Sequence, residues 1–223
     1  MKRRAGAGCD RPERAFFLVT NGAPGALLDE VPSPADAVLV DRLRRGERAA
    51  FRELYGRFAQ PSFGFLLRLT GRRDAAEDLH QEVWLSIAQH AQRLAPDTDL
   101  PAWIFTIARN RFRSAQRRAD ASETPRDPAA LERAAGAVPA DDPACRDLER
   151  ALAALPEIHR EVLLLVGVEG LGLKQTAEVL AIAHDAARQR LSRARAALAE
   201  ILSVAGDDAA TPMATSTARK VSS

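Results

Sequence analysis

Acidic and amide side chains recur on one face of a predicted helix near the middle of the chain. Asp74 followed by Glu77 is a capping-box pattern, which predicts that this helix starts at Asp74. Asp78, Gln81 and Glu82 then share its outer face, with the two carboxylates one helical turn apart. Like charges at this spacing repel, and we expect no basic residue on that face to relieve them. The pattern indicates either a docking surface for a cationic partner or a solvated acidic face.

A second set of polar residues lies on a predicted helix that begins near Leu100-Pro101, where proline suits the first turn. The residues of this helix that could contact nucleic acid are Trp103, Phe105, Arg109, Asn110, Arg113 and Arg117. The three arginines stack one turn apart with Phe105 in line below them, so we expect this face to point outward. Arginine planes and aromatic rings stack on bases, and an amide can read a base edge. The alternative is a basic surface helix with Trp103 and Phe105 in the core.

A third set lies nearer the carboxyl end, where a turn at Ala181-Ile182-Ala183 joins two predicted helices. So short a connection, with the small Ala177 inside the first helix, matches a helix-turn-helix. Glycine would suit position 181 better if that residue is left-handed. We expect Ala187, Leu191, Ala194 and Leu198 to pack inward. The remaining outward side chains could read bases and hold phosphates in a major groove: Lys174, Arg188, Gln189, Ser192 and Arg193.

Composition places these three sets on an all-α protein of 223 residues. Aromatic residues make up only 5%, and apolar residues recur at helical rather than alternating spacing. We expect two small helical domains joined by a flexible acidic linker, with the helix-turn-helix in the second domain. The expected parts are a disordered extension at 1–32, a first domain at 33–118, the linker at 119–147, a second domain at 148–202 and a disordered tail at 203–223. In the first domain, Phe51 and Tyr55 are expected in the core.

The sequence offers little for catalysis. Its four histidines form no ligand pattern and it has no phosphate-cradling Gly-Lys loop, so we expect no enzyme, no metal site and no cofactor. Cys9 and Cys145 lie in segments expected to be unstructured, and two such thiols fit a reducing cytoplasm better than a disulfide framework. The apolar runs at 16–19 and 162–166 are too short to cross a membrane, so we expect no membrane insertion.

The order of these parts resembles the extracytoplasmic-function sigma factors of bacterial RNA polymerase, within the sigma-70 family. The resemblance covers roughly Asp36 to Leu202, and its motifs are DAAEDLHQEVW, PAWIFTIARNRFRSAQRR and the stretch from LPEIHREVLLL to the second basic helix. It implies a non-catalytic subunit that binds core RNA polymerase and directs promoter-specific initiation. It also implies that Asp78, Gln81 and Glu82 dock on the clamp of the largest core subunit, which would supply the cations for the acidic face.

By the same resemblance, the two basic sets contact promoter DNA. Trp103, Phe105, Asn110 and the nearby arginines fall in the segment that opens and reads the minus-ten element, beside a base-capturing loop at 95–99. Arg188, Gln189, Ser192 and Arg193 match positions that read the minus-thirty-five element. Leu100, His184, Asp185 and Ala186 depart from the residues usual in the family, so promoter preference is not carried over. The resemblance further implies an anti-sigma factor as a partner.

Two other functions stay open. The chain could be a helix-turn-helix regulator that acts on duplex DNA without core polymerase and uses its first domain for dimerisation. It could also be a sigma mimic that titrates an anti-sigma factor, although such a protein would need no DNA-contacting arginines.

Overall fold

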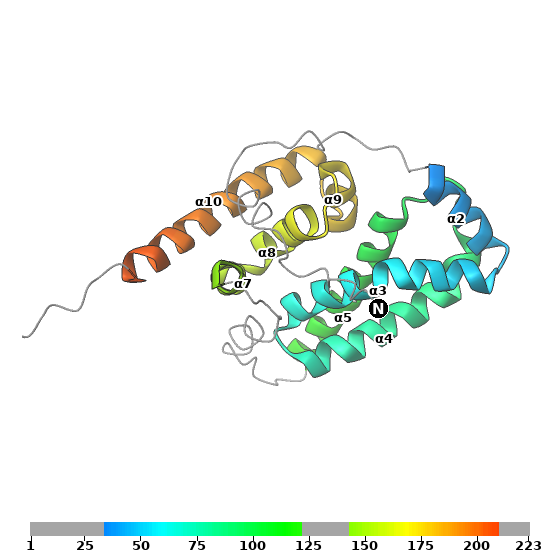
Figure 1. Ribbon diagram of the computed structural model, residues 1–223, viewed down its shortest axis with the longest axis horizontal. Helices are drawn as coiled ribbons and strands as arrows, with labels where there is room; N and C mark the ends of the chain where they lie inside the picture. Colours follow the sequence, from blue (N-terminus) through cyan, green and yellow to red (C-terminus); the bar gives the residue numbers. More distant parts are fainter. Residues whose placement is uncertain (1–33, 122–142, 210–223) are drawn as a thin grey trace, which may run out of the picture.

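Every regular element within the described residues, 34–121 and 143–209, is a helix, which confirms the all-α prediction. The computed structural model has, in chain order, α2 (Pro34–Arg44), α3 (Arg48–Thr70), α4 (Arg73–His90), the short 3-10 helix η1 (Ala91–Arg93), α5 (Leu100–Ala121), α7 (Pro143–Ala154), α8 (Glu157–Leu163), the π-helical turn η2 (Leu164–Val168), α9 (Leu173–Leu180) and α10 (His184–Ala209). Figure 1 shows α2 to α5 in one group and α7 to α10 in another beside it.

The first group is a helical bundle whose core lies between α3, α4 and α5. Leu54, Phe65, Ile87 and Ile104 are fully buried in it, and helical spacing brings each of them to the inner face of its helix. The glycine at position 71 ends α3 in a left-handed conformation that suits a residue without a side chain, and its N–H donates to the carbonyl of Leu67. The chain then turns directly into α4.

The start of α4 differs from the prediction. Arg72 is the N-cap residue and no side chain caps the helix, so the expected capping box is wrong. Asp74 instead accepts hydrogen bonds from the guanidinium of Arg72, and Glu77 accepts one from Arg73 at 2.8 Å. Each carboxylate therefore has an arginine partner close in sequence. These arginines compete with the free backbone N–H groups of the first turn for the carboxylate oxygens.

The second group packs α7, α8, α9 and α10 around an apolar centre. Leu152, Leu155 and Leu163 are buried there, and the run expected to form a buried helix, 162–166, is buried throughout. Arg160 is buried among them. Its guanidinium donates to the carbonyls of Leu152, at 2.9 Å, and of Leu155, at 2.7 Å, and so satisfies groups that the end of α7 leaves open.

Helical structure extends further than expected at both ends of the predicted linker and into the predicted tail. The helix α5 runs to Ala121, α7 begins at Pro143, and α10 continues to Ala209. Cys145 is buried in α7, so its expected place in an unstructured segment is wrong. Predictions for 1–33, 122–142 and 210–223, which include the N-terminal extension and Cys9, lie outside the described residues.

The two groups are in direct contact. The helix α5 packs against α9, and α3 meets α8. Within the described part of the chain, no helix is both long and apolar enough to cross a membrane. The contact between the groups determines which of the predicted site residues reach the surface.

Candidate functional site

The acidic face of α4 lies on the surface, as the sequence predicted. Asp78 and Gln81 are exposed and Glu82 is partly exposed. The expectation that no basic residue lies near this face is wrong, because α5 packs along α4 and brings Arg111 and Arg118 to 3.9 Å and 3.7 Å from the Glu82 carboxylate. Ion pairs this long and this exposed contribute at most about 1 kcal/mol, so Glu82 can exchange them for another partner.

Aromatic packing beneath this face holds α4 in place. Trp84 is buried, and its ring meets Phe51 and Tyr55 edge to face, with centroids 6.0 Å and 4.7 Å away. Tyr55 nevertheless keeps 47% of its surface exposed, so its predicted core position is wrong. Leu85 is 62% exposed and follows Asp78 by two helical turns, which adds an apolar side chain to the acidic face. Sequence analysis missed Leu85 because a lone leucine in a helical pattern is usually assigned to the core.

Phe105 does not share the outer face of the arginines. Its ring is 2% exposed and meets Phe65 edge to face at a centroid distance of 5.4 Å. The predicted outward position of Phe105 is wrong because α3, α4 and α9 all pack on α5, which widens its buried face. Trp103 is partly buried against the same core, whereas Asn110 and Arg117 are exposed.

Arg109 and Arg113 face the second group of helices instead of solvent. The Nε atom of Arg109 lies 3.2 Å from Oε1 of Glu161, and its Nη1 donates to the carbonyl of Val179 at 3.4 Å. Arg113 reaches Oε2 of Glu161 at 3.2 Å and Oε1 of Glu157 at 2.8 Å. One buried carboxylate of α8 is therefore shared by two arginines of α5.

The loop before α5 is also tied to the second group. Oδ1 of Asp99 accepts the N–H of Ala102 at 2.9 Å, which caps the start of α5. Oδ2 of Asp99 accepts a hydrogen bond from Nε2 of Gln175, on α9, at 2.6 Å. Oε1 of Gln175 in turn accepts the N–H of Gly172 at 2.7 Å. The segment 95–99 is therefore fixed at its end by a side chain from a distant part of the sequence.

The helix-turn-helix is present as α9, the turn at 181–183 and α10. Ala181 adopts the left-handed conformation, with φ 53° and ψ 48°. The predicted inward stripe of α10 is buried at all four positions, Ala187, Leu191, Ala194 and Leu198. The five side chains predicted to point outward are all exposed: Lys174, Arg188, Gln189, Ser192 and Arg193. The packing prediction for this motif is confirmed.

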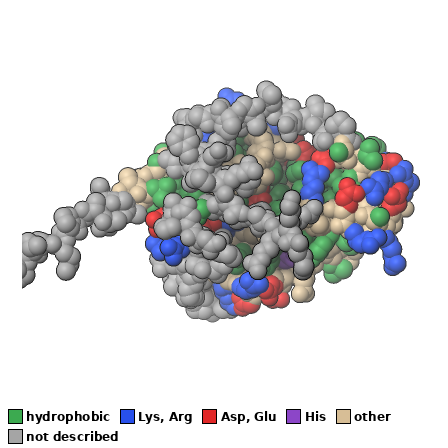
Figure 2. Space-filling view, in the orientation of Figure 1, with side chains coloured by type: hydrophobic (Ala, Val, Ile, Leu, Met, Phe, Trp, Pro, Cys, Tyr) green, Lys and Arg blue, Asp and Glu red, His purple; other side chains and the backbone are tan. Residues whose placement is uncertain are grey.

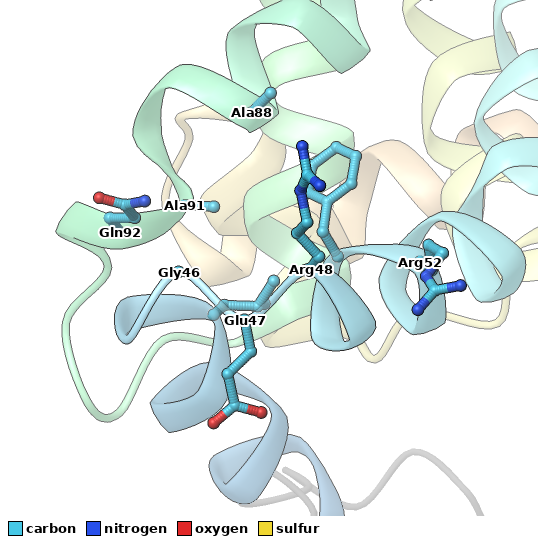
Figure 3. Close-up of a pocket in the computed structure, with 9 residues that line it drawn as sticks. Gly46, Glu47, Arg48, Arg52, Ala88, Ala91 and Gln92 are labelled. Atoms are coloured by element: carbon cyan, nitrogen blue, oxygen red, sulfur yellow. The ribbon is translucent and has the colours of Figure 1, made fainter.

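The structure also has a hollow of about 620 Å³ that the sequence did not indicate. It is formed by the end of α2, the loop after it, the start of α3 and the end of α4 with η1 (Figure 3). Leu43, Phe51 and Ala91 give it apolar walls, and Arg48 and Arg52 contribute charge. Figure 2 shows basic and acidic side chains mixed at the α2 end of the molecule. Among the described residues, no three His, Cys, Asp or Glu side chains gather as a metal site would require.

Comparison with known proteins agrees with this division into two parts. The family model "Sigma-70 region 2" matches residues 54–122, and "Sigma-70, region 4" matches residues 145–198. The chain is 37% identical to RNA polymerase sigma factor CarQ of Myxococcus xanthus, over 73% of this chain and 95% of that protein. It is 34% identical to ECF RNA polymerase sigma factor EcfG of Rhodopseudomonas palustris, over 66% and 83%. Its structure is similar to that of the sigma factor RpoE, solved with the anti-sigma factor NepR from Bartonella quintana, with a TM-score of 0.57, 26% identity and coverage of 69% and 97%.

Proposed function

Because the chain belongs to the extracytoplasmic-function sigma factors of the sigma-70 family, we propose that its exposed faces divide between core RNA polymerase and promoter DNA. Members of this family bind core RNA polymerase and direct initiation at specific promoters, and this chain does the same. Sigma factors are regulatory subunits, and the polymerase carries out the chemistry. What needs a proposal is which side chains make each contact.

The polymerase contact is assigned to the acidic face of α4. Asp78, Gln81 and Glu82 present two carboxylates and an amide to solvent, and Leu85 adds an apolar contact at the same face. This combination suits a cationic helical element of the polymerase clamp. Charge complementarity would speed the encounter, and the leucine would add buried apolar area. The aromatic packing under Trp84 keeps the face in one orientation.

The minus-thirty-five contact is assigned to the helix-turn-helix. Arg188, Gln189 and Ser192 project from the first turns of α10, the part of a recognition helix that reaches base edges. Lys174 and Arg193 are placed to hold phosphates and set the register. The observation that carries the proposal is that all five predicted contacts, on α9 and α10, are exposed while the packing stripe of α10 is buried.

The minus-ten contact is assigned to α5. Asn110 and Arg117 are exposed and Trp103 is partly exposed, while Arg109 and Arg113 would contribute once the second group of helices moves away. Phe105 supports this helix from the core and is not assigned a contact. We place the protein in the cytoplasm, where its polymerase is, and infer an anti-sigma factor as a further partner because the similar RpoE was solved with one.

Run-off transcription with core polymerase on genomic fragments tests the function directly. Start sites that appear only when the protein is added are the expected result. Asp78→Arg with Glu82→Arg should abolish core binding and these start sites while leaving helicity unchanged. Asp41→Arg with Glu53→Arg, which reverses two exposed carboxylates on α2 and α3, is the matched control. Unchanged core binding by the double variant would refute the polymerase assignment, and tight dimeric binding to duplex without core would favour the regulator alternative.

A further inference from the structure

The hollow where α2, α3 and η1 meet owes part of its shape to a tight loop. Gly46, in the loop between α2 and α3, has a φ of 74°, in the left-handed region that glycine adopts without strain. A Cβ atom at this position would lie 2.8 Å from Nε2 of Gln92, so the missing side chain lets the loop approach η1 closely. The hollow of about 620 Å³ falls within the range of about 300–1,000 Å³ that is usual for small-molecule sites.

Much of the wall of this hollow is apolar. Leu43 and Ala91 are buried, Phe51 is partly buried and Ala88 is exposed. These four side chains come from α2, η1, α3 and α4, so the packing of the bundle fixes their positions. A hydrocarbon group placed against such a wall removes apolar surface from water, which is favourable. The wall therefore suits the apolar part of a small molecule.

Two arginines line the same hollow without a carboxylate partner. Arg48 and Arg52 are one helical turn apart on α3, and both are exposed. Neither forms an ion pair with any residue in the described ranges 34–121 and 143–209. Figure 3 shows the Arg48 side chain extending from the start of α3 toward Ala88 on α4. Like charges at this spacing repel, and an anion bound to both guanidiniums would relieve the repulsion.

The one carboxylate among the lining residues is turned away from the hollow. The two oxygens of Glu47 accept hydrogen bonds at 3.0 Å from Nε of Arg42 and Nε of Arg45. These bonds lower the pKa of Glu47, so the carboxylate is ionised at neutral pH and engaged by those two arginines. In Figure 3 it points toward α2, whereas Arg48 points toward α4. The positive charge of the hollow is therefore not balanced by its own wall.

We propose that this hollow binds a small organic acid, whose carboxylate is held by Arg48 and Arg52 and whose hydrocarbon part lies against Phe51 and the other apolar side chains. A guanidinium matches a carboxylate with two parallel hydrogen bonds. The size of the site favours a small molecule over a protein partner, because standard protein interfaces use about 20–30 residues a side and nine residues line the hollow. None of the nine is assigned to polymerase or DNA, so the proposal goes beyond the proposed function.

The first experiment compares simple ligands on the unmodified full chain. Octanoate is titrated into isotope-labelled protein, and the amide signals of Gly46, Arg48 and Gln92 should shift most and reach saturation. Octylammonium has the same hydrocarbon chain and the opposite charge, so it should bind at least about tenfold more weakly. Butanoate buries fewer methylene groups and should also bind about tenfold more weakly. Equal affinities for octanoate and octylammonium, or shifts confined to residues outside the hollow, would overturn the proposal.

The second experiment removes the two positive charges. Arg48→Gln with Arg52→Gln should weaken octanoate binding by about tenfold. Arg146→Gln with Arg150→Gln, at two exposed positions with the same spacing on α7, removes the same charge elsewhere and should stay within about twofold of the unmodified protein. All four side chains are exposed, so both variants are expected to fold. An octanoate affinity that does not differ between the two variants would overturn the proposal.

The third experiment supplies the missing anion from the protein itself. Ala88→Glu places a carboxylate on α4, on the side toward which Arg48 extends, and should weaken octanoate binding by about tenfold through competition for the same guanidinium. Gln89→Glu adds the same charge at the next position, which does not line the hollow, and should change the affinity by less than about threefold. Equal losses in the two variants would mean that net charge accounts for the effect.

An acidic amphipathic peptide tests whether a protein partner fits the hollow better. At the same concentration it should leave the octanoate-dependent shifts of Gly46 and Gln92 unchanged. Saturable binding of the peptide at these residues, without binding of octanoate, would overturn the small-molecule assignment. None of these measurements uses core polymerase or DNA. Failure of the proposed function would appear in the run-off assay and would leave the octanoate results unaffected.

Discussion

The indole N–H of Trp84 donates a hydrogen bond to Nε2 of His80, 2.8 Å away and one helical turn earlier on α4. The carbonyl of Ala59 lies 2.9 Å from the same nitrogen, and because a carbonyl can only accept and an indole N–H can only donate, Nε2 hydrogen-bonds to one of the two at a time. Burial lowers the pKa of His80, and the hydrogen bond to Ala59 opposes this effect in part. The helix that carries the acidic face thus rests on a histidine that the fold keeps uncharged.

Acid should weaken the fold through this histidine. A free histidine has a pKa of about 6.5, and the pKa of folded His80 is lower. As pH falls from 7.5 towards 5.5, the unfolded chain takes up a proton that the folded protein resists, so the free energy of unfolding decreases. Urea denaturation at the two pH values measures this loss. His80→Gln should show a smaller loss, and an identical loss in both proteins would mean that other groups account for it.

Arg160→Met should be strongly destabilising. The guanidinium is buried and donates to the carbonyls of Leu152, Ala153 and Leu155, which would lose their partners. Unsatisfied buried acceptors cost about 1–3 kcal/mol each, and partial rehydration reduces the sum, so we expect a loss of about 3–5 kcal/mol in urea denaturation. Arg150→Met, at an exposed position of α7, is the control and should stay within about 0.5 kcal/mol of the unmodified protein.

Ala181→Gly should stabilise the helix-turn-helix. Ala181 holds φ at 53°, a conformation that costs a residue with a Cβ about 1–2 kcal/mol. Part of this gain is offset by the greater freedom of glycine in the unfolded chain, so we expect a net gain of about 0.5–1 kcal/mol in thermal or urea denaturation. Ala196→Gly, at an exposed helical position of α10, should instead cost about 1 kcal/mol. A loss at both positions would show that the turn does not hold this conformation in solution.

Arg188 and Arg193 should respond differently to promoter sequence. Arg188→Ala should cost about 1–3 kcal/mol on promoters with the preferred base at one position and little on those without it. Arg193→Ala should weaken binding by a similar factor on every sequence and reduce the dependence on salt. Affinities of the holoenzyme for a panel of single-base promoter variants give both results. A uniform loss for Arg188→Ala would make Arg188 a phosphate contact.

Sequence patterns were sufficient for three helix faces, although the local capping-box pattern at the start of α4 was not. The inward stripe of α10, the exposed set beside it and the acidic face of α4 all follow from a period of 3.6 residues. The sequence also indicated that glycine would suit position 181 better if that residue is left-handed, and Ala181 is left-handed. In these cases, the residues that determine burial are separated by three or four positions, and the sequence shows them directly.

Patterns failed where a distant segment supplies the partner. Phe105 was placed outside because the sequence of α5 does not reveal that three other helices cover it. Arg109 and Glu161 are 52 positions apart, and Arg68 and Glu149 are 81 apart. No periodicity relates such pairs, so the covered state of the basic face appears only in three dimensions.

The forked hydrogen bonding between Arg68 of α3 and Glu149 of α7 restricts how the two groups of helices can pack against each other. An apolar contact between helices tolerates a shift by a fraction of a helical turn. A guanidinium paired with both oxygens of a carboxylate loses most of its hydrogen bonding after a small shift. The two groups of helices should therefore take the same relative position in every molecule in which this ion pair forms. An inhibitor shaped for that single geometry would meet a uniform target.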